Sequence, residues 1–302
     1  MTNAILRGKP DAGNPHVRFD EGEVASAKPR RGSLLYNGMG ETADMIEACT
    51  EAAKAAEKVL PKTVSGLDDV VASIVDVFSL MLYPVKKANL FYKYKLEEFA
   101  LNLQTRIAER KIVNFKMPEL EVLGPVLEAM RYTIDNVDLR KLYLNLLASS
   151  VDADSPDLAH PSYVDVIKRM NGYDARLFQY LLSERGYIEV ANPKLHICNS
   201  NRIVMNATPE WYINAEEFQK DAFRTSASLV RIAGAGLIDL MYDHSAGGSY
   251  DWVASSAILK KILDDRQRVK IDKLELTYAK SVIVVNDNGR QFARACGISV
   301  WW

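Results

Sequence analysis

The sequence has few of the residues that build covalent or metal-held sites. Its 302 residues include only three cysteines and four histidines. Cys49, Cys198 and Cys296 form no Cys-x-x-Cys pair. A disulfide framework and a cysteine-rich zinc site are therefore not expected, and a reducing cytoplasm is the favoured location.

The sequence also has no apolar run long enough to cross a bilayer. The most apolar helical stretch, 70–83, is shorter than the roughly 20 residues that a spanning helix needs, and Asp76 lies near its middle. The first ten residues lack the apolar segment of a secretory leader. We expect a cytoplasmic protein in which 67–83 is a buried core helix. The alternative is a protein peripheral to the inner membrane, in which this helix binds or enters an anionic surface, because basic residues follow it.

Charge of one sign is not in excess, and recognisable catalytic motifs are missing. There are 38 Lys and Arg residues against 39 Asp and Glu, a net charge of -1. This balance argues against a globally basic nucleic-acid binder and against an acidic solvating protein. No H-E-x-x-H, G-x-S-x-G, Walker A or zinc-deaminase pattern occurs. We therefore predict no catalytic residues, no metal site, no cofactor and no small-molecule substrate.

The chain divides by pattern into three parts. Residues 1–40 contain several prolines and glycines and no helical or strand period, which predicts a flexible tail. Residues 41–171 predict a helical domain. Its apolar positions recur every three or four residues, first from Tyr92 to Ile107, then from Leu123 to Ile134, then from Leu139 to Leu147. Pro125 is expected in the first turn of the second of these helices. Residues 172–302 are the third part.

Two helical stretches carry opposite charge. Residues 41–76 hold eight carboxylates against three lysines, and 84–116 hold eight basic residues against three glutamates. The two stretches are expected to pack together or alternate in a bundle. The alternative is a basic face kept for an anionic lipid, a nucleic acid or a protein partner. The candidate interaction surface, which also includes the two closing tryptophans, is Lys86, Lys87, Lys93, Lys95, Arg106, Arg110, Lys111, Trp301 and Trp302.

The third part predicts a winged-helix-like α+β domain. The expected order is a helix at 174–182, a strand at 187–190, a helix capped by Asn214 and Glu217, a helix to 233, a strand at 237–242, a turn and a returning strand at 250–253. The fold class is thus mainly α, with a helical bundle followed by this domain. If the domain binds nucleic acid, the candidate contacts are Lys220, Arg224, Arg231, Lys260, Lys261, Arg266 and Arg268.

The histidines and remaining cysteines point to structural roles. His160 precedes Pro161 and is expected to cap a helix or bond across its loop, although a general base assisted by Asp152, Asp154 or Asp157 is the alternative. His196 and Cys198 supply only two ligands, whereas a closed zinc site needs four. Cys296 lies on an apolar helix and is expected in the core.

Three stretches together resemble the abortive infection alpha family. They are DVFSLMLYPVKKANLFYKYKLEEFALNL, PELEVLGPVLEAMRYTIDNVDLRKLYLNLLASSVD with its Leu-Leu-Ala-Ser box, and HPSYVDVIKRMNGYDARLFQYL. LVRIAGAGLI and VNDNGRQFARAC are also similar to the family. The resemblance implies a bacterial or phage-borne protein associated with anti-phage defence, and it implies no catalytic residues.

These observations favour a non-enzymatic abortive infection protein that acts through a protein partner or self-association. Two other functions remain as alternatives. One is a DNA-binding regulator that uses the C-terminal domain, and the other is a membrane-active effector that uses helix 67–83.

Overall fold

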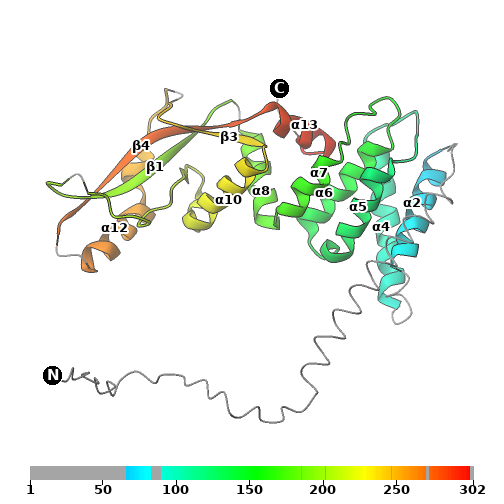
Figure 1. Cartoon of the computed structure of the whole chain (residues 1–302), viewed down its shortest axis with the longest axis horizontal. Helices are drawn as coiled ribbons and strands as arrows, with labels where there is room; N and C mark the ends of the chain where they lie inside the picture. The colour runs from blue at the N-terminus through cyan, green and yellow to red at the C-terminus, as the bar shows by residue number, and fades with distance from the viewer. Residues whose placement is uncertain are drawn as a thin grey trace, which may run out of the picture. The chain divides into compact units, whose positions relative to one another are not determined.

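The computed structural model describes residues 66–82, 90–184, 186–200, 202–245, 247–269 and 272–299, without the side chains of 90–93. These residues form eleven helices and four strands (Figure 1). The tail expected at 1–40 and the part of the acidic stretch from 41 to 65 lie outside this description.

The first five described helices bury the apolar stripes that the sequence predicted. They are α2 (Leu67–Met81), α4 (Leu90–Glu109), α5 (Leu120–Thr133), α6 (Val137–Ser150) and α7 (Ser162–Arg169). On α4, Leu96, Phe99, Leu103 and Ile107 are all buried. The three helical stripes are therefore confirmed wherever the side chains are described.

The apolar helix α2 is part of the core. Its buried face includes Val70, Ile74 and Phe78, and the Phe78 ring lies 4.9 Å from that of Phe99 on α4. Gln104 Nε2 of α4 also donates to Asp68 Oδ1 at 3.1 Å. The expected packing of the acidic helix against the basic one is confirmed for α2 and α4. No helix within the described ranges has the length and apolar character to cross a bilayer.

Pro125 corrects one predicted boundary. The helix was expected to begin next to this proline, but α5 begins at Leu120 and carries Pro125 in its interior. An interior proline removes one helical hydrogen bond. Val122 and Leu123, which precede Pro125, are buried in the core, and this burial offsets the lost bond.

The second half places helices next to one antiparallel sheet. Helix α8 (Gly172–Ser183) precedes β1 (Ile188–Ile197) and β2 (Tyr212–Ile213), and α9 (Glu216–Gln219) and α10 (Ala222–Gly234) precede β3 (Ile238–Tyr242). The chain then forms α11 (Asp251–Ser255), α12 (Ala257–Val269), β4 (Leu274–Val285) and α13 (Asp287–Ala295). The strand order is β2-β1-β4-β3. The described chain is thus mainly helical with one small sheet, an α+β arrangement.

Long β1 and β4 form the centre of the sheet. They pair from Ile188 opposite Ile283 to Ile197 opposite Leu274. At one end of this ribbon β3 pairs with β4, and Ile238 lies opposite Val285. Asn192 and Ser281, from β1 and β4, are buried and bonded to each other through their side chains. This pair satisfies two polar groups that would be costly to leave unpaired in the interior.

The strand expected at Tyr250–Val253 is wrong, because these residues begin helix α11. Ser249 Oγ accepts from the Asp251 backbone N–H at 3.2 Å, a local bond that favours a helix start over an extended chain. Tyr250 and Val253 are buried on the same short helical turn. The strand that returns along β3 is instead β4, so residues 243–273 connect the two strands and contain α11 and α12.

The predicted capping box of Asn214 and Glu217 is also wrong. The residue that caps α9 is Ala215, which makes no side-chain bond, and α9 ends before α10 begins. The capping box that the structure does contain is formed by Asn171 and Asp174 at the start of α8. Asn171 is therefore the residue that caps the start of α8.

One cluster of buried apolar side chains includes residues from Val70 to Cys296. It includes stripes of α2, α4, α5 and α6 as well as Val190, Ile283 and Phe292 from the second half. The domain boundary proposed between residues 171 and 172 stays a prediction. The buried core includes residues from both sides of that position.

Candidate functional site

The end of α13 meets the end of α4 at a junction that we define by Arg110, Ser149 and Ala295. The Arg110 guanidinium donates to the carbonyl oxygens of Ala295 at 2.8 Å and Arg294 at 3.1 Å, and more weakly to Asn145 at 3.4 Å. Ser149 Oγ donates to the Ala295 carbonyl at 2.5 Å. The carbonyl groups at a helix C-terminus have no helical partner. Arg110 and Ser149 satisfy them and complement the negative end of the helix dipole.

Two stretches that suggested the family meet at this junction. Ser149 belongs to the Leu-Leu-Ala-Ser box on α6, and Ala295 belongs to the Phe-Ala-Arg-Ala-Cys sequence on α13. They are 146 residues apart in the chain. Gly297 follows α13 with φ 63, and the Ile298 N–H donates back to the Ala293 carbonyl at 2.8 Å. This is a Schellman ending, which turns the chain sharply away from the helix.

The ionisable groups near the junction are shifted by burial. Burial lowers the pKa of Arg110, although an arginine that starts so high remains charged at neutral pH. Burial raises the pKa of the Cys296 thiol, which is fully buried and therefore neutral and unreactive. The expected core position of Cys296 is confirmed. Burial likewise raises the pKa of Tyr143, whose hydroxyl has no protein partner among the described residues.

A polar pocket lies beside the junction. Its volume is about 210 Å³, and its wall comes from α4, α6, α8 and the residues that follow α13. The charged side chains in the wall are Arg106, Asp138, Lys141 and Arg176. Arg176 pairs with Asp138 at 2.5 Å, and Arg106 pairs with Glu109 at 2.9 Å. Three cations therefore share the wall with one carboxylate.

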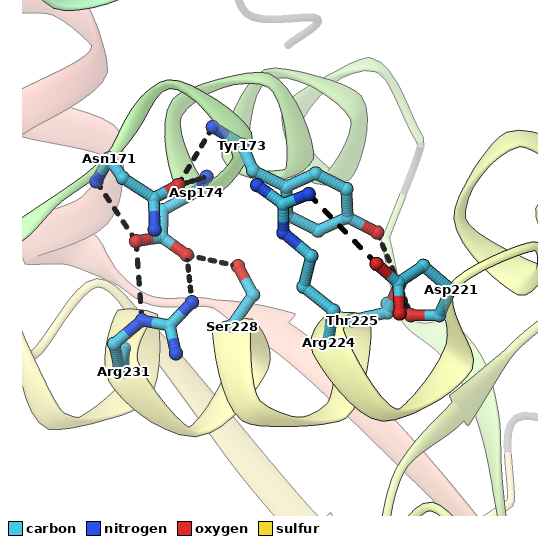
Figure 2. A network of polar contacts seen from close by, with 8 residues as sticks. All are labelled: Asn171, Tyr173, Asp174, Asp221, Arg224, Thr225, Ser228 and Arg231. Carbon is cyan, nitrogen blue, oxygen red and sulfur yellow. Dashed lines mark hydrogen bonds and ion pairs between the residues drawn. The ribbon is translucent and has the colours of Figure 1, made fainter.

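A second polar cluster joins α8 to α10 (Figure 2). Asp174, of which 1% is exposed, accepts from the Asn171 backbone N–H at 3.0 Å, from Ser228 and from Arg231 at 2.7 Å. Burial alone would raise the pKa of Asp174. The hydrogen bonds from Arg231, Ser228 and Asn171 outweigh burial and hold that pKa below its ordinary value. Asp174 is thus a charged anchor between the two helices.

Tyr173 and Arg224 continue this contact along α10. The Tyr173 hydroxyl bonds to Thr225 Oγ1 at 2.5 Å, and Thr225 donates in turn to the Phe218 carbonyl at 2.6 Å. The Arg224 guanidinium lies over the Tyr173 ring, 4.2 Å from its centroid, and 3.9 Å from Asp221 (Figure 2). The cluster holds the two helices together, and its Ser228 hydroxyl, which is bonded to Asp174, is fully buried.

His160 is in a structural position. His160 Nδ1 accepts from the Ser162 backbone N–H at 3.1 Å and lies 2.7 Å from Ser162 Oγ. It therefore caps the start of α7, as expected. Asp154, one of the three carboxylates proposed to assist His160 as a general base, bonds to Asn114 instead. Within the part of the chain that the structure describes, no three His, Cys, Asp or Glu side chains are grouped as metal ligands would be.

Most described residues of the candidate interaction surface have partners within the chain. Lys95 pairs with Glu98 and Asp135, both at 3.4 Å, while Arg106 and Arg110 make the contacts given above. Lys111 is exposed. Lys86, Lys87, Trp301, Trp302 and the side chain of Lys93 lie outside the described residues.

The candidate nucleic-acid contacts fall into two groups. On α10, Arg224 and Arg231 are engaged by α8, and Lys220 is exposed just before the helix begins. On α12 all four residues are exposed: Lys260, Lys261, Arg266 and Arg268. Arg268 pairs with Asp265 at 3.6 Å. Although Arg224 and Arg231 have these partners, 53% and 43% of their side chains stay exposed, so both α10 and α12 present basic groups to solvent.

The outer face of α10 was missed by the sequence analysis. Phe223 and Val230 are 48% and 46% exposed, and exposed Ala227 lies between them. Their spacing of four and three residues places all three on one face. The same spacing is visible in the sequence, but an apolar stripe normally marks the buried side of a helix. We name Phe223, Ala227 and Val230 the α10 stripe.

These features define a class of protein: an α+β chain whose helices and sheet share one core and meet at an arginine-held junction. The chain belongs to the abortive infection alpha family, whose sequence profile matches residues 92–296. The match includes the junction, the Asp174 cluster, the α10 stripe and the pocket wall as far as Cys296. No curated protein and no solved structure matches the chain.

Proposed function

We propose that this protein serves in abortive infection by binding another protein through the α10 stripe, without catalysing a reaction. The family match supports the defence role. The single observation that supports the mode of action is the exposure of Phe223 and Val230 on a helix whose two arginines each contact α8. An exposed apolar face suits a protein surface, in which aromatic and aliphatic anchors contribute most of the binding energy.

The order of elements supports a winged-helix-like arrangement for this half of the chain. Helix α8, strands β1 and β2, helices α9 and α10 and strand β3 follow one another. Two more helices precede the final strand, β4, which lies between β1 and β3. In such an arrangement α10 occupies the position of the helix that would read a DNA groove. Reading base edges requires Arg, Lys, Asn or Gln on the outer face. The α10 stripe carries none of these, which favours a protein partner.

A phage plaque assay tests the proposal. Cells that express the chain with Phe223→Asp and Val230→Asp together should lose protection, because two carboxylates at the centre of an apolar contact cannot be desolvated. The matched control is Val113→Asp, which alters another exposed apolar residue far from α10 in sequence. Circular dichroism and thermal unfolding establish that both variants are folded. Full protection by the folded double variant would refute the proposal.

A DNA-binding function is the second candidate, supported by α12. Lys260, Lys261 and Arg266 are exposed, and no ion pair involves them among the described residues. This function predicts DNA affinity that falls steeply as salt rises, since each phosphate contact releases counterions. Fluorescence anisotropy with duplex DNA at several salt concentrations measures this slope. Weak binding with a flat salt dependence would eliminate the second candidate.

The membrane-active alternative requires a conformational change in addition to the apolar sequence of α2. The apolar face of α2 is packed against α4 and α5, so α2 must leave the core before it can insert. Dye release from anionic liposomes tests this alternative, and the absence of release would remove it.

A further inference from the structure

We propose that the pocket beside the junction binds a phosphate group, either as inorganic phosphate or as part of a small phosphate monoester. This inference is independent of the proposed partner surface. It rests on three cations from three helices that line one pocket: Arg106 of α4, Lys141 of α6 and Arg176 of α8. Asp138 is the only carboxylate in the pocket wall.

The two arginines are held in position but keep donors to spare. Asp138 binds one nitrogen of Arg176, and Glu109 binds one nitrogen of Arg106. A guanidinium has five N–H donors in a rigid plane, so each arginine retains N–H groups for a ligand. Pairing with a carboxylate fixes the side chain, which lowers the entropy lost when an anion binds.

Lys141 is the cation with no competing partner. It is exposed, and no carboxylate pairs with it among the described residues, although Asp138 lies one helical turn before it. Its ammonium therefore has three donors open to a ligand. Asn145 and Gln179, also in the wall, add amide donors. Cys296 contributes a neutral thiol rather than a thiolate, because burial raises its pKa. The wall is therefore rich in donors and poor in negative charge, which suits an oxyanion.

The size of the pocket limits the ligand. Its volume of about 210 Å³ is below the roughly 300–1,000 Å³ of pockets that hold drug-sized molecules. A phosphate group with a small organic substituent fits this volume, whereas a dinucleotide does not. Because the wall includes Gly297 and Ile298 after α13 as well as three earlier helices, a bound anion would stabilise the junction.

Isothermal titration of the full chain with inorganic phosphate tests the inference, with ionic strength held constant by sodium chloride. We expect saturable binding and a melting temperature that rises with phosphate. Lys141→Ala should weaken the affinity about tenfold or more, the size of one lost charged hydrogen bond. The matched control is Lys168→Ala on α7, an exposed lysine outside the pocket, which should bind as the unmodified chain does.

A parallel titration with adenosine monophosphate distinguishes the two sources of the phosphate group. Equal affinity for both probes would assign the pocket to the phosphate alone, and tighter binding of the monophosphate would assign it to an ester. Absence of saturable binding by either probe would overturn the inference. Equal loss of affinity in the two lysine variants would also overturn it, because that result would mean nonspecific attraction.

Discussion

Asp174 links the first turn of α8 to α10 with one side chain. It closes the Asn171 capping box and accepts from Ser228 and Arg231 as well. The capping signal Asn171-x-x-Asp174 is visible in the sequence, but Asn171-Gly172 is equally typical of the end of a helix. The bonds to Ser228 and Arg231 could not be inferred, because 54 and 57 residues separate these side chains from Asp174.

Asp174→Asn should destabilise the fold at neutral pH by about 2–3 kcal/mol, because the amide cannot pair with Arg231 and cannot accept all of the bonds. Bonds to Asp174 depress its pKa in the folded state, so its contribution is present above the ordinary carboxyl pKa and is lost as pH falls through the depressed value. The difference between variant and unmodified chain in urea unfolding should therefore be smaller at pH 3 than at pH 7.

The control for this variant is Asp157→Asn in the loop before α7, where no interaction of the carboxylate is recorded among the described residues. It should change the free energy of unfolding by no more than a few tenths of a kcal/mol. If Asp174→Asn lowered the free energy of unfolding equally at both pH values, the assignment of a charged Asp174 carboxylate would be contradicted.

At the scale of elements, periodicity predicted the helices better than it predicted the sheet. The stripes on α4, α5 and α6 were visible because buried positions recur every three or four residues. β1 gave a weaker signal, since four successive residues, Val190 to Pro193, are buried on both sides of the strand. Helix α11 was missed because aromatic Tyr250 and Trp252 favour a strand in isolation.

The contact between α13 and Leu237, the residue before β3, depends on a glycine. A Cβ at Gly289 would lie 2.1 Å from the Leu237 carbonyl oxygen, a contact that the structure must move to relieve. Gly289→Ala should lower the free energy of unfolding by about 1–3 kcal/mol, the usual cost of overpacking. Chemical denaturation measures the change.

Gly234→Ala is the matched control at the last residue of α10, where a Cβ meets no atom within 4 Å. It should leave stability unchanged or raise it by up to about 1 kcal/mol, because alanine loses less backbone entropy than glycine. Equal destabilisation by both substitutions would contradict the close packing at Gly289.

At the scale of the whole molecule, the junction connects the helices of the first half to the last helix of the chain. Arg110 had been assigned to an interaction surface on the basis of charge alone, and that role stays a prediction. Its three carbonyl acceptors are invisible in the sequence, because two of them lie 184 and 185 residues away. The charge pattern of a sequence identifies a basic residue, but it does not identify the acceptor groups to which that residue binds.

Arg110→Met should therefore loosen the junction. Removing the guanidinium leaves the carbonyls of Arg294 and Ala295 short of a donor, which costs about 2 kcal/mol. Hydrogen exchange at the amides of α13 should become faster. The control is Lys111→Met, one residue further on and exposed. It should leave the stability and the hydrogen exchange of α13 unchanged. Unchanged α13 exchange in Arg110→Met would show that the junction is held by apolar packing alone.

The central claim is that this protein acts through an apolar protein contact on α10 rather than through basic residues on α12. The most direct measurement compares two variants in the same phage plaque assay: Phe223→Asp with Val230→Asp, and Lys260→Glu with Lys261→Glu and Arg266→Glu. The account predicts that the α10 variant loses protection and that the α12 variant retains it, with both proteins folded and equally abundant. Retained protection by the α10 variant and loss by the α12 variant would contradict the account.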